Sequence, residues 1–330
     1  MSASAVEFVK KVGKGKTLSA DLAPAEAREA FAMLLDGGFL PAQFGAFLQA
    51  LRIKELTQEE LDALTEVFRG RMAPLPPLPG PHSLVLNLAS DTQRKGGLAC
   101  LLAAYLLPRL GVSVGIVRSE PVLQGNRASF ELSRDLAMNL SMKLAGEGPA
   151  PVLAECGTLV RGLSALDGLR GQLGFRSCLH TAEKLINPWP ASPVLLGISH
   201  KHYALRMAAT LARQGMAGRI LLGNHGTVDL VLHKETEMVS VAAAGTIVEE
   251  TLSPAGLDLE IPSDVYSLAK FPQWAEWIGA MSAETPEARD NGLRRAIHYH
   301  VGMLLWAAGA APDARAGLTA ARRGIPRLFA

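Results

Sequence analysis

The sequence has no large excess of charge of either sign. Its 330 residues include 33 lysines and arginines against 31 aspartates and glutamates, a formal net charge of +2. This balance points to no polyanionic partner by itself, although a local patch of one sign is compatible with it. The chain also lacks any run of roughly 18 apolar residues, so it predicts no transmembrane helix and no membrane partner.

Cysteine and aromatic residues are scarce. Cys100, Cys156 and Cys178 are scattered, without Cys-x-x-Cys spacing, and we expect them to be small buried hydrophobic residues and not metal ligands or nucleophiles. Aromatic residues make up 5% of the chain, which leaves few rings for base stacking. Residues 1–16 lack the apolar segment of a secretory signal, so we expect a cytoplasmic protein.

Apolar residues, by contrast, are abundant. They make up 48% of the chain, enough for a well-filled interior, and the length exceeds what one hydrophobic core usually organises. Prolines crowd residues 72–82 (MAPLPPLPGPH), which prevents a helix and favours a stiff extended connection. We therefore predict two domains, residues 1–72 and 73–330, with the boundary at this segment.

The apolar periodicity differs between the two parts. In the first, Pro24 and Pro41 stand at helix starts, and Thr57 with Glu60 forms a capping box. In the second, short apolar runs alternate with helical patterns, which is typical of a parallel sheet. The sequence thus predicts an α/β fold, a small N-terminal helical domain plus a larger domain whose mainly parallel central sheet is covered by helices. The expected strands are residues 84–88, 112–117, 194–198, 220–222, 228–232, 238–242 and 246–251, followed by two helices within 286–329.

Several segments together resemble one known family. Residues 34–69 (LLDGGFLPAQFGAFLQALRIKELTQEELDALTEVFR) are similar to the helical-domain signature of the anthranilate phosphoribosyltransferase family, which includes pyrimidine nucleoside phosphorylases. Residues 173–190 (LGFRSCLHTAEKLINPWP) resemble its Leu-Gly-x-Arg segment with the closing Asn-Pro, and RILLGNHGTVDL and AIHYHVGMLLWAAGA follow in the family's order. The resemblance implies the family's fold, helices from about 160–190 joining the helical domain, and a homodimer formed through that domain.

The resemblance fails at the loops that handle diphosphate. Where the family has Gly-Thr-Gly-Gly-Asp against pyrophosphate, this chain has ASDTQRKGG, and the Ser-Thr pair that follows is Ala99 and Cys100. The family's Lys-His-Gly-Asn-Arg loop is replaced by VRSEP at residues 117–121. The chain's own Gly-Asn-Arg, residues 125–127, is either a shifted loop or a helix cap.

The family's adjacent Asp-Glu pair for Mg²⁺ is also missing. After His225 and Gly226 only Asp229 offers a carboxylate, and one carboxylate binds Mg²⁺ poorly. His200 and His202 have no third ligand nearby, and His298 and His300, two residues apart on an expected helix, cannot converge on one ion. We therefore predict no metal site and no cofactor, with Mg²⁺ expected only if the protein is an enzyme.

Basic residues stand where the diphosphate motifs are lost. A phosphate can be held by loop cations and backbone N–H groups together, although the same loop could be merely solvated. The candidate anion site is Ser90, Asp91, Thr92, Arg94, Lys95, Gly96 and Arg118. A second group is expected in the cleft between the domains: Arg176, His180, Lys184 and His225. Arg176 and His180 would share a helix face if this segment is helical. The resemblance implies that Arg176 contacts an aromatic acid acceptor; alternatively, both residues satisfy backbone carbonyls at the domain interface.

The C-terminal region is rich in arginine. A helical end of this kind is a plausible surface for a phosphate backbone, because fixed cations displace condensed counterions. Alternatively, the arginines pair with acidic helices of the first domain, such as residues 55–66. The candidate nucleic-acid surface is Arg315, Arg322, Arg323 and Arg327, with Arg294 and Arg295 upstream.

These features lead to one main hypothesis and its rivals. The lost Mg²⁺ pair and the basic replacements resemble a divergent branch of the family that keeps the fold and dimer but is associated with nucleic-acid binding. We expect a homodimer that binds DNA, RNA or another polyanion. The main rival is an active phosphoribosyl- or pentosyltransferase with an altered donor or acceptor. A third is a small-molecule or partner-protein sensor that keeps the cleft as a regulatory pocket, and a phosphorylated small molecule is a further possible partner.

Overall fold

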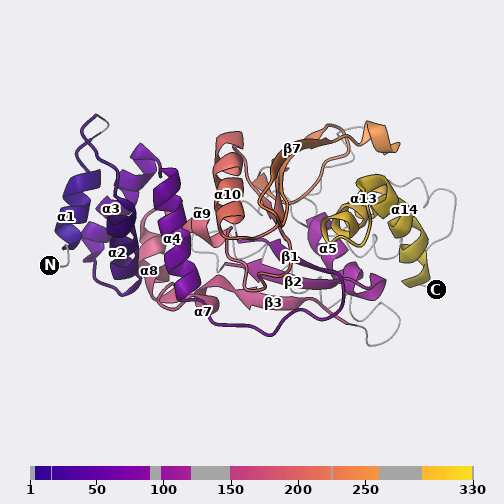
Figure 1. The fold of residues 1–330 in the computed structure, drawn as a ribbon, viewed down its shortest axis with the longest axis horizontal. Helices are drawn as coiled ribbons and strands as arrows, with labels where there is room; N and C mark the ends of the chain where they lie inside the picture. Colours follow the sequence, from indigo (N-terminus) through magenta and orange to yellow (C-terminus); the bar gives the residue numbers. More distant parts are fainter. Residues whose placement is uncertain are drawn as a thin grey trace.

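The computed structural model describes residues 4–15, 17–89, 98–119, 149–223, 226–259 and 292–328. A helical bundle lies at one end of the molecule and the C-terminal helices lie at the other, with a twisted sheet between them (Figure 1). No helix within these ranges combines the length and apolar content that a membrane crossing requires.

The bundle is built from α1 (Ala5–Val12), α2 (Pro24–Leu35), α3 (Pro41–Lys54) and α4 (Gln58–Gly70). As predicted, Pro24 and Pro41 begin helices, where a missing N–H costs nothing. The Thr57 hydroxyl accepts the Glu60 N–H at 3.2 Å, and the Glu60 carboxylate accepts the Thr57 N–H at 2.9 Å. This capping box fixes the start of α4 and, with it, the α3–α4 loop.

The strands of the described ranges form one seven-stranded sheet in the order β3-β2-β1-β4-β5-β6-β7. The first five in this order pair in parallel, and β6 and β7 add an antiparallel hairpin. The predicted α/β class with a mainly parallel sheet is therefore confirmed. The strands are β1 (Ser83–Asn87), β2 (Ser113–Arg118), β3 (Val152–Glu155), β4 (Val194–Gly197), β5 (Gly218–Leu221), β6 (Thr236–Val241) and β7 (Ile247–Leu252).

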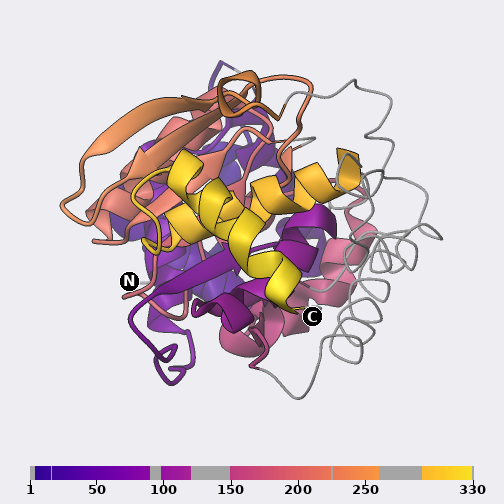
Figure 2. The ribbon, with the colours of Figure 1, turned by 90° about the vertical axis from the view of Figure 1, so that its right-hand side faces the viewer.

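Alternate residues of the central strands feed two hydrophobic cores. Leu84 and Leu86 of β1 face a core shared with α5 (Leu98–Leu106) and α13 (Gly292–Ala307), whereas Val85 faces a core continuous with the helical bundle. Figure 2 shows α13 crossing α14 (Ala314–Gly324) in front of α5. The bundle thus shares one hydrophobic core with the rest of the same chain.

Short helices connect the sheet to the bundle. α8 (Asp167–Gln172) and α9 (Cys178–Glu183) pack against α3, and α9 also contacts α4. α10 (Lys201–Arg213) lies on β5 and β6 and contacts α4. The remaining short helices are α7 (Cys156–Leu159), η2 (Leu107–Leu110), η3 (Ser164–Leu166), η5 (Ala255–Leu257) and η7 (Ile325–Leu328). These contacts place α9 and the start of α10 beside the α3–α4 loop.

The predicted strand at residues 228–232 is wrong. This segment is buried but irregular, because its amides bond to side chains instead of a neighbouring strand. The Asp229 N–H donates to the Thr227 hydroxyl at 3.2 Å, and the Leu230 N–H donates to Nε2 of His300 at 2.9 Å. An apolar run alone cannot distinguish such a segment from a strand.

The proline-rich segment is extended and is fastened to the α/β domain. The Ala73 N–H donates to the Leu159 carbonyl at 2.8 Å, and Nε1 of Trp189 donates to the Pro76 carbonyl at 3.0 Å. The indole is 3% exposed and lies over Gly115 of β2. A Cβ at Gly115 would lie 2.3 Å from the ring, so the strand needs glycine at this position.

Candidate functional site

A cavity of about 280 Å³ lies between the helical bundle and the α/β domain. One wall comes from the end of α3 and the α3–α4 loop, and the other from α9 and the start of α10 with the β4 end beneath it. The lining residues are Leu51, Arg52, Leu56, Arg176, Ser177, Cys178, His180, Thr181, Lys184, Ile198, Ser199, His200, Tyr203 and Gly226. We call this cavity the interdomain cleft.

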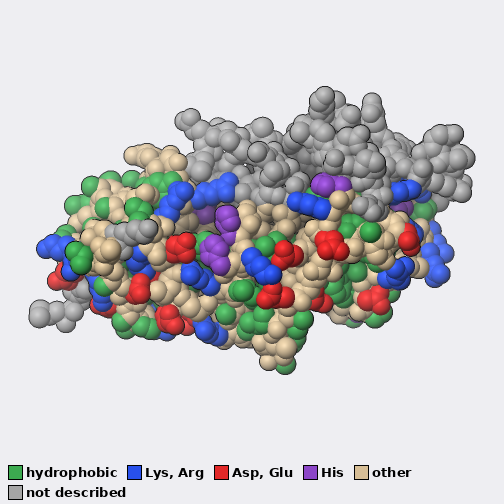
Figure 3. Space-filling view, turned by 90° about the horizontal axis from the view of Figure 1, so that it is seen from above, with side chains coloured by type: hydrophobic (Ala, Val, Ile, Leu, Met, Phe, Trp, Pro, Cys, Tyr) green, Lys and Arg blue, Asp and Glu red, His purple; other side chains and the backbone are tan. Residues whose placement is uncertain are grey.

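The lining of the interdomain cleft is basic. It contains Arg52, Arg176 and Lys184 together with His180 and His200, and none of the described residues that line it is an aspartate or glutamate. Figure 3 shows Lys, Arg and His side chains gathered in the middle of the face seen from above, where the bundle meets the α/β domain. Such a concave cationic surface attracts anions more strongly than the small net charge suggests.

The cleft brings together three of the residues predicted from the sequence, Arg176, His180 and Lys184. Arg176, however, precedes α9, which begins at Cys178, so the condition for a common helix face with His180 is not met. His180 lies in the first turn, where its Nδ1 accepts the Ser177 N–H at 3.2 Å. This bond places the proton of the neutral ring on Nε2.

Lys184 holds the cleft floor together. Its Nζ donates to the Gly197 carbonyl at 2.5 Å and lies 3.5 Å from the Gly226 carbonyl. The side chain thus joins the end of β4 to the turn at Gly226, and its residue is only 8% exposed. Lys184 therefore contributes a buried positive charge from a fixed position.

Arg52 is a cleft residue that the sequence reasoning missed. It lies near the C-terminal end of α3, exposed, with its guanidinium carbon 5.2 Å from the centre of the Phe175 ring. Phe175 lies next to Arg176 in the chain, so this cation–π contact brings two arginines that are far apart in the sequence to the same cleft. Helical periodicity places Arg52 on a helix surface but does not say what that surface faces.

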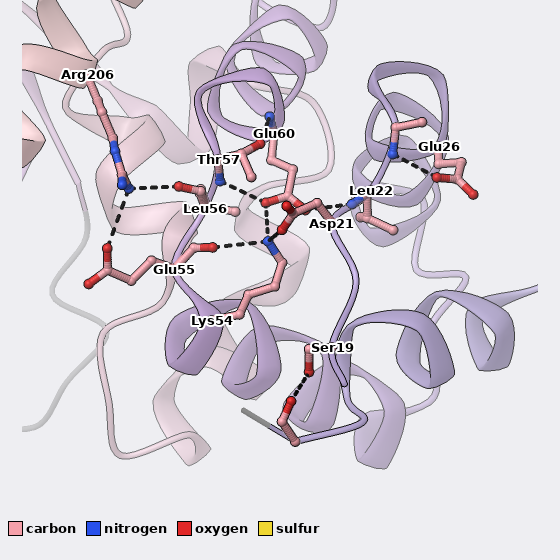
Figure 4. Close-up of polar contacts among 12 residues, drawn as sticks. Ser19, Asp21, Leu22, Glu26, Lys54, Glu55, Leu56, Thr57, Glu60 and Arg206 are labelled. Carbon is pink, nitrogen blue, oxygen red and sulfur yellow. Dashed lines mark hydrogen bonds and ion pairs between the residues drawn. The ribbon is translucent and has the colours of Figure 1, made fainter. Parts of the chain in front are cut away.

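The α3–α4 loop is held by a buried ion pair (Figure 4). Nζ of Lys54 lies 2.5 Å from the Glu60 carboxylate, which is fully buried and also accepts the Leu22 N–H at 2.9 Å. Lys54 donates as well to Asp21 at 2.8 Å and to the Glu55 carbonyl at 3.0 Å. With each buried polar group satisfied, the loop keeps a single shape.

Arg206 of α10 joins this loop to the other domain. Its guanidinium donates to the Leu56 carbonyl at 2.8 Å and lies 3.5 Å from the Glu55 carboxylate (Figure 4). Glu55 itself has φ 61° and ψ 152°, a region that almost only glycine adopts and that costs about 1–3 kcal/mol. The cleft wall is therefore fixed by interactions from both domains and carries local strain.

The cysteines have no nucleophilic character. Burial raises the pKa of Cys178, which lines the cleft, to about 12, and it raises the pKa of Cys100 and Cys156 well above the usual range. All three thiols are buried and free, so the expectation of small buried hydrophobic residues is confirmed. A thiolate, which is the reactive form, does not form there at neutral pH.

The described carboxylates do not fit Mg²⁺ at the cleft. Asp229 is 1% exposed, its Oδ1 accepts the Cys100 N–H at 3.0 Å, and it lies 3.6 Å from Nε2 of His300. It ties α5 to α13 and does not line the cleft. Within the described ranges there is no group of three or more His, Cys, Asp or Glu side chains that could hold a metal ion.

Most of the predicted anion loop lies outside the described residues. Ser90, Asp91, Thr92, Arg94, Lys95 and Gly96, together with His225 and the Gly-Asn-Arg at 125–127, lie outside the described residues. Arg118, at the end of β2, is described and forms an ion pair with Glu155 of β3. It does not line the cleft.

The C-terminal arginines lie far from the cleft. Arg315, Arg322 and Arg323 are exposed on α14 and Arg327 follows it, at the opposite end of the molecule from the bundle (Figure 1). The alternative that they pair with residues 55–66 is wrong. Those acidic residues pair elsewhere: Glu55 with Arg206, Glu60 with Lys54, Asp62 with Arg213 and Glu66 with Arg28.

Comparisons with known proteins agree with this architecture. Residues 6–72 match the glycosyl transferase family, helical bundle domain. The whole chain superimposes on the anthranilate phosphoribosyltransferase (TrpD) from Thermus thermophilus with a TM-score of 0.72 at 22% identity, covering 98% of this chain and 95% of that one. Fold and cleft thus define the class, a two-domain α/β protein with a glycosyl transferase-type helical bundle.

Comparison of the amino-acid sequence with those of known proteins narrows this class of protein further. An uncharacterised Aquifex aeolicus protein is 28% identical over 94% of this chain and 95% of its own length. An anthranilate phosphoribosyltransferase from Anaeromyxobacter sp. is 27% identical over 93% and 91%. The uncharacterised Escherichia coli protein YbiB is 26% identical over 86% and 90%. Over nearly its whole length the chain is thus similar to anthranilate phosphoribosyltransferases and to uncharacterised proteins of the same fold.

Proposed function

We propose that this chain is a divergent member of the anthranilate phosphoribosyltransferase-like family that binds nucleic acid, or another polyanion, in the interdomain cleft. The observation that carries the proposal is the lining of that cleft. Arg52, Arg176 and Lys184 converge on one cavity with two histidines, and no acidic side chain is among its described lining residues. Convergent cations in a partly desolvated cleft bind phosphate groups without needing a metal ion.

The position of the Asp229 carboxylate supports the same proposal. In a magnesium-dependent site a carboxylate would face the cleft, but here Asp229 is committed to the Cys100 amide and faces His300. The described part of the cleft is thus equipped to hold phosphate but not to place a divalent cation on it. Binding without transfer fits this arrangement best.

The test is fluorescence anisotropy with labelled oligonucleotides at rising salt. We expect binding at low salt, with the logarithm of the association constant falling linearly with the logarithm of salt concentration, by about 0.7 per phosphate contact for a single strand. Single-stranded DNA, single-stranded RNA and a duplex should each be measured. Absence of binding to all three at low salt would refute the proposal.

Active transferase chemistry is the second candidate. It is favoured by one observation, the 27% identity over 93% of this chain to a protein named anthranilate phosphoribosyltransferase. Calorimetry with phosphoribosyl pyrophosphate, with and without Mg²⁺, separates the two candidates. Heat that requires Mg²⁺ would favour the transferase, whereas oligonucleotide binding without that heat favours the first proposal.

We also propose that the helical bundle forms a homodimer. Among the described residues its surface carries large exposed apolar side chains, Val6, Leu18, Leu40 and Ile53, with exposed fractions of 42–71%. Apolar surface of this kind is typical of an interface between subunits. Sedimentation at several protein concentrations tests this, and Leu40→Glu with Ile53→Glu should shift the equilibrium toward monomer.

A further inference from the structure

Three aromatic rings lie side by side at the start of α10, and the first and last of them in the chain line the interdomain cleft. The rings of His200 and His202 have centroids 5.9 Å apart with planes 28° apart, and the rings of His202 and Tyr203 lie 4.4 Å apart at 42°. His200 and Tyr203 both line the cleft. We call these three residues the ring row.

Arg206 of the same helix, α10, packs on the ring row and also reaches the α3–α4 loop. The guanidinium carbon of Arg206 lies 5.7 Å from the Tyr203 ring centre, while the same guanidinium donates to the Leu56 carbonyl in the α3–α4 loop. Burial raises the pKa of Tyr203, so its phenol stays neutral at physiological pH. A ring that is already fixed loses little entropy when a ligand stacks on it.

The cleft combines this row with apolar and cationic walls. Leu51 and Leu56 face it from the helical bundle, and Arg52 and Arg176 stand beside them. A ligand that satisfies all three kinds of contact has a flat aromatic part and an anionic part. A nucleotide unit has both, as a base and a phosphate.

We propose that the ring row is a stacking platform for an unpaired base, so that the cleft selects single-stranded over double-stranded nucleic acid. This inference rests on the proposed function and specifies its ligand. In a duplex the bases stay stacked on one another. A cleft of about 280 Å³ can therefore contact only the backbone of a duplex. An unpaired base has a free aromatic face on which a ring can stack. Because all four bases have such a face, the cleft should prefer single strands over duplexes without preferring a particular sequence.

The first experiment varies the ligand and leaves the protein intact. Anisotropy is measured with a labelled single-stranded oligonucleotide, the corresponding duplex, and an abasic oligonucleotide of equal length and charge. We expect the single strand to bind about 10-fold more tightly than either of the others, from the stacking energy of one to two bases. Equal affinity for the single strand and the abasic strand would overturn the platform.

The second experiment varies the ring. Tyr203→Leu should weaken single-strand binding about 10-fold and change duplex binding less than two-fold, and Tyr203→Phe, which keeps the ring, should restore single-strand binding. A 2-aminopurine base in the oligonucleotide gives an independent readout, because its fluorescence is quenched when it stacks. No quenching with the unaltered protein would contradict the proposal even if Tyr203→Leu failed to fold.

The outcomes separate this inference from the function on which it rests. If all three ligands bind equally, and with the expected salt dependence, the cleft binds phosphate but the platform is wrong. If no ligand binds at low salt, the proposed function itself fails. A Phe variant as weak as the Leu variant would mean that Tyr203 acts through its hydroxyl group, which also overturns stacking.

Discussion

Two regions of this protein concentrate positive charge, and they differ in how the charge is held. In the interdomain cleft, cations from separate segments of the chain converge on one cavity, and the wall formed by the α3–α4 loop is fixed by Lys54, Glu60 and Arg206. On α14 the arginines are exposed on a convex helix, and Arg315 bonds to the Gly256 carbonyl and lies 3.8 Å from Asp258. The number of arginines in the sequence favours α14 as the anion-binding site, whereas the geometry of the structure favours the interdomain cleft.

The largest effect that we expect is a loss of folding stability at low pH, and it is caused by His298 of α13 in the C-terminal region. Burial first, and then the charges of Arg294 and Arg322, lower the pKa of His298 from 6.5 to about 4. Between these pH values the unfolded chain binds a proton that the folded chain does not, so stability is lost as the pH falls. The loss should approach about 3 kcal/mol.

Urea unfolding at pH 7 and pH 4.5 measures this loss. His298→Gln cannot titrate, so its stability should fall less over the same interval. If the variant and the unaltered protein lose stability equally, His298 does not have the lowered pKa. Confirmation would show that the C-terminal region buries a titratable group, His298, which destabilises the fold at low pH.

The cleft arginines should carry most of the binding. Arg52→Ala with Arg176→Ala should weaken single-strand binding on the order of 10- to 100-fold at low salt, and should reduce the salt slope by about 1.4, since two phosphate contacts are lost. Arg69, exposed on α4 away from the cleft lining, is the matched control, and Arg69→Ala should stay within about two-fold. An equal loss in both variants would mean that binding follows total charge and not the cleft.

Relief of the backbone strain at Glu55 should give a smaller effect of opposite sign, a gain in folding stability. Glu55→Gly should raise the free energy of unfolding by about 1 kcal/mol, because relief of the strained backbone outweighs the extra entropy of glycine in the unfolded chain. Glu55→Ala keeps a Cβ at φ 61° and should bring no gain. Thermal or urea unfolding of both variants distinguishes backbone strain from loss of the Glu55–Arg206 contact.

The smallest effect is expected on α14. Arg322→Ala, Arg323→Ala and Arg327→Ala combined should weaken oligonucleotide binding only about three-fold at low salt, and hardly at all at physiological salt, because exposed charges are screened over a Debye length of about 8 Å. The same anisotropy series measures it. A loss larger than that of the cleft variant would reverse the comparison and make α14 the main binding surface.

Local signals in the sequence predicted much of the fold. Pro24, Pro41 and the Thr57–Glu60 capping box mark real helix starts, since caps depend on neighbouring residues only. The strand at 228–232 was wrong because its amides find Thr227 and His300 as partners. His300 lies 70 residues from Leu230, a distance that no local pattern can span.

The candidate site was predicted in part. Arg176, His180 and Lys184 were found through the family resemblance and do line one cavity. Arg52 and Tyr203 were missed, because each looks like an ordinary surface residue of a helix until the other domain is placed opposite it. Asp229 was correctly singled out as the only carboxylate of its turn, but its partner, the Cys100 amide, lies 129 residues away in the chain.

The contact between Trp189 and the proline-rich segment has a practical consequence. Because the indole lies on Gly115 and donates to Pro76, the segment between the domains is a fastened strap and not a free hinge. Any movement of one domain that displaces the proline-rich segment must break the hydrogen bond between the Trp189 indole and the Pro76 carbonyl and expose the indole to water. The protein thus contains its own fluorescent reporter of interdomain motion, placed on the opposite side of the sheet from α5.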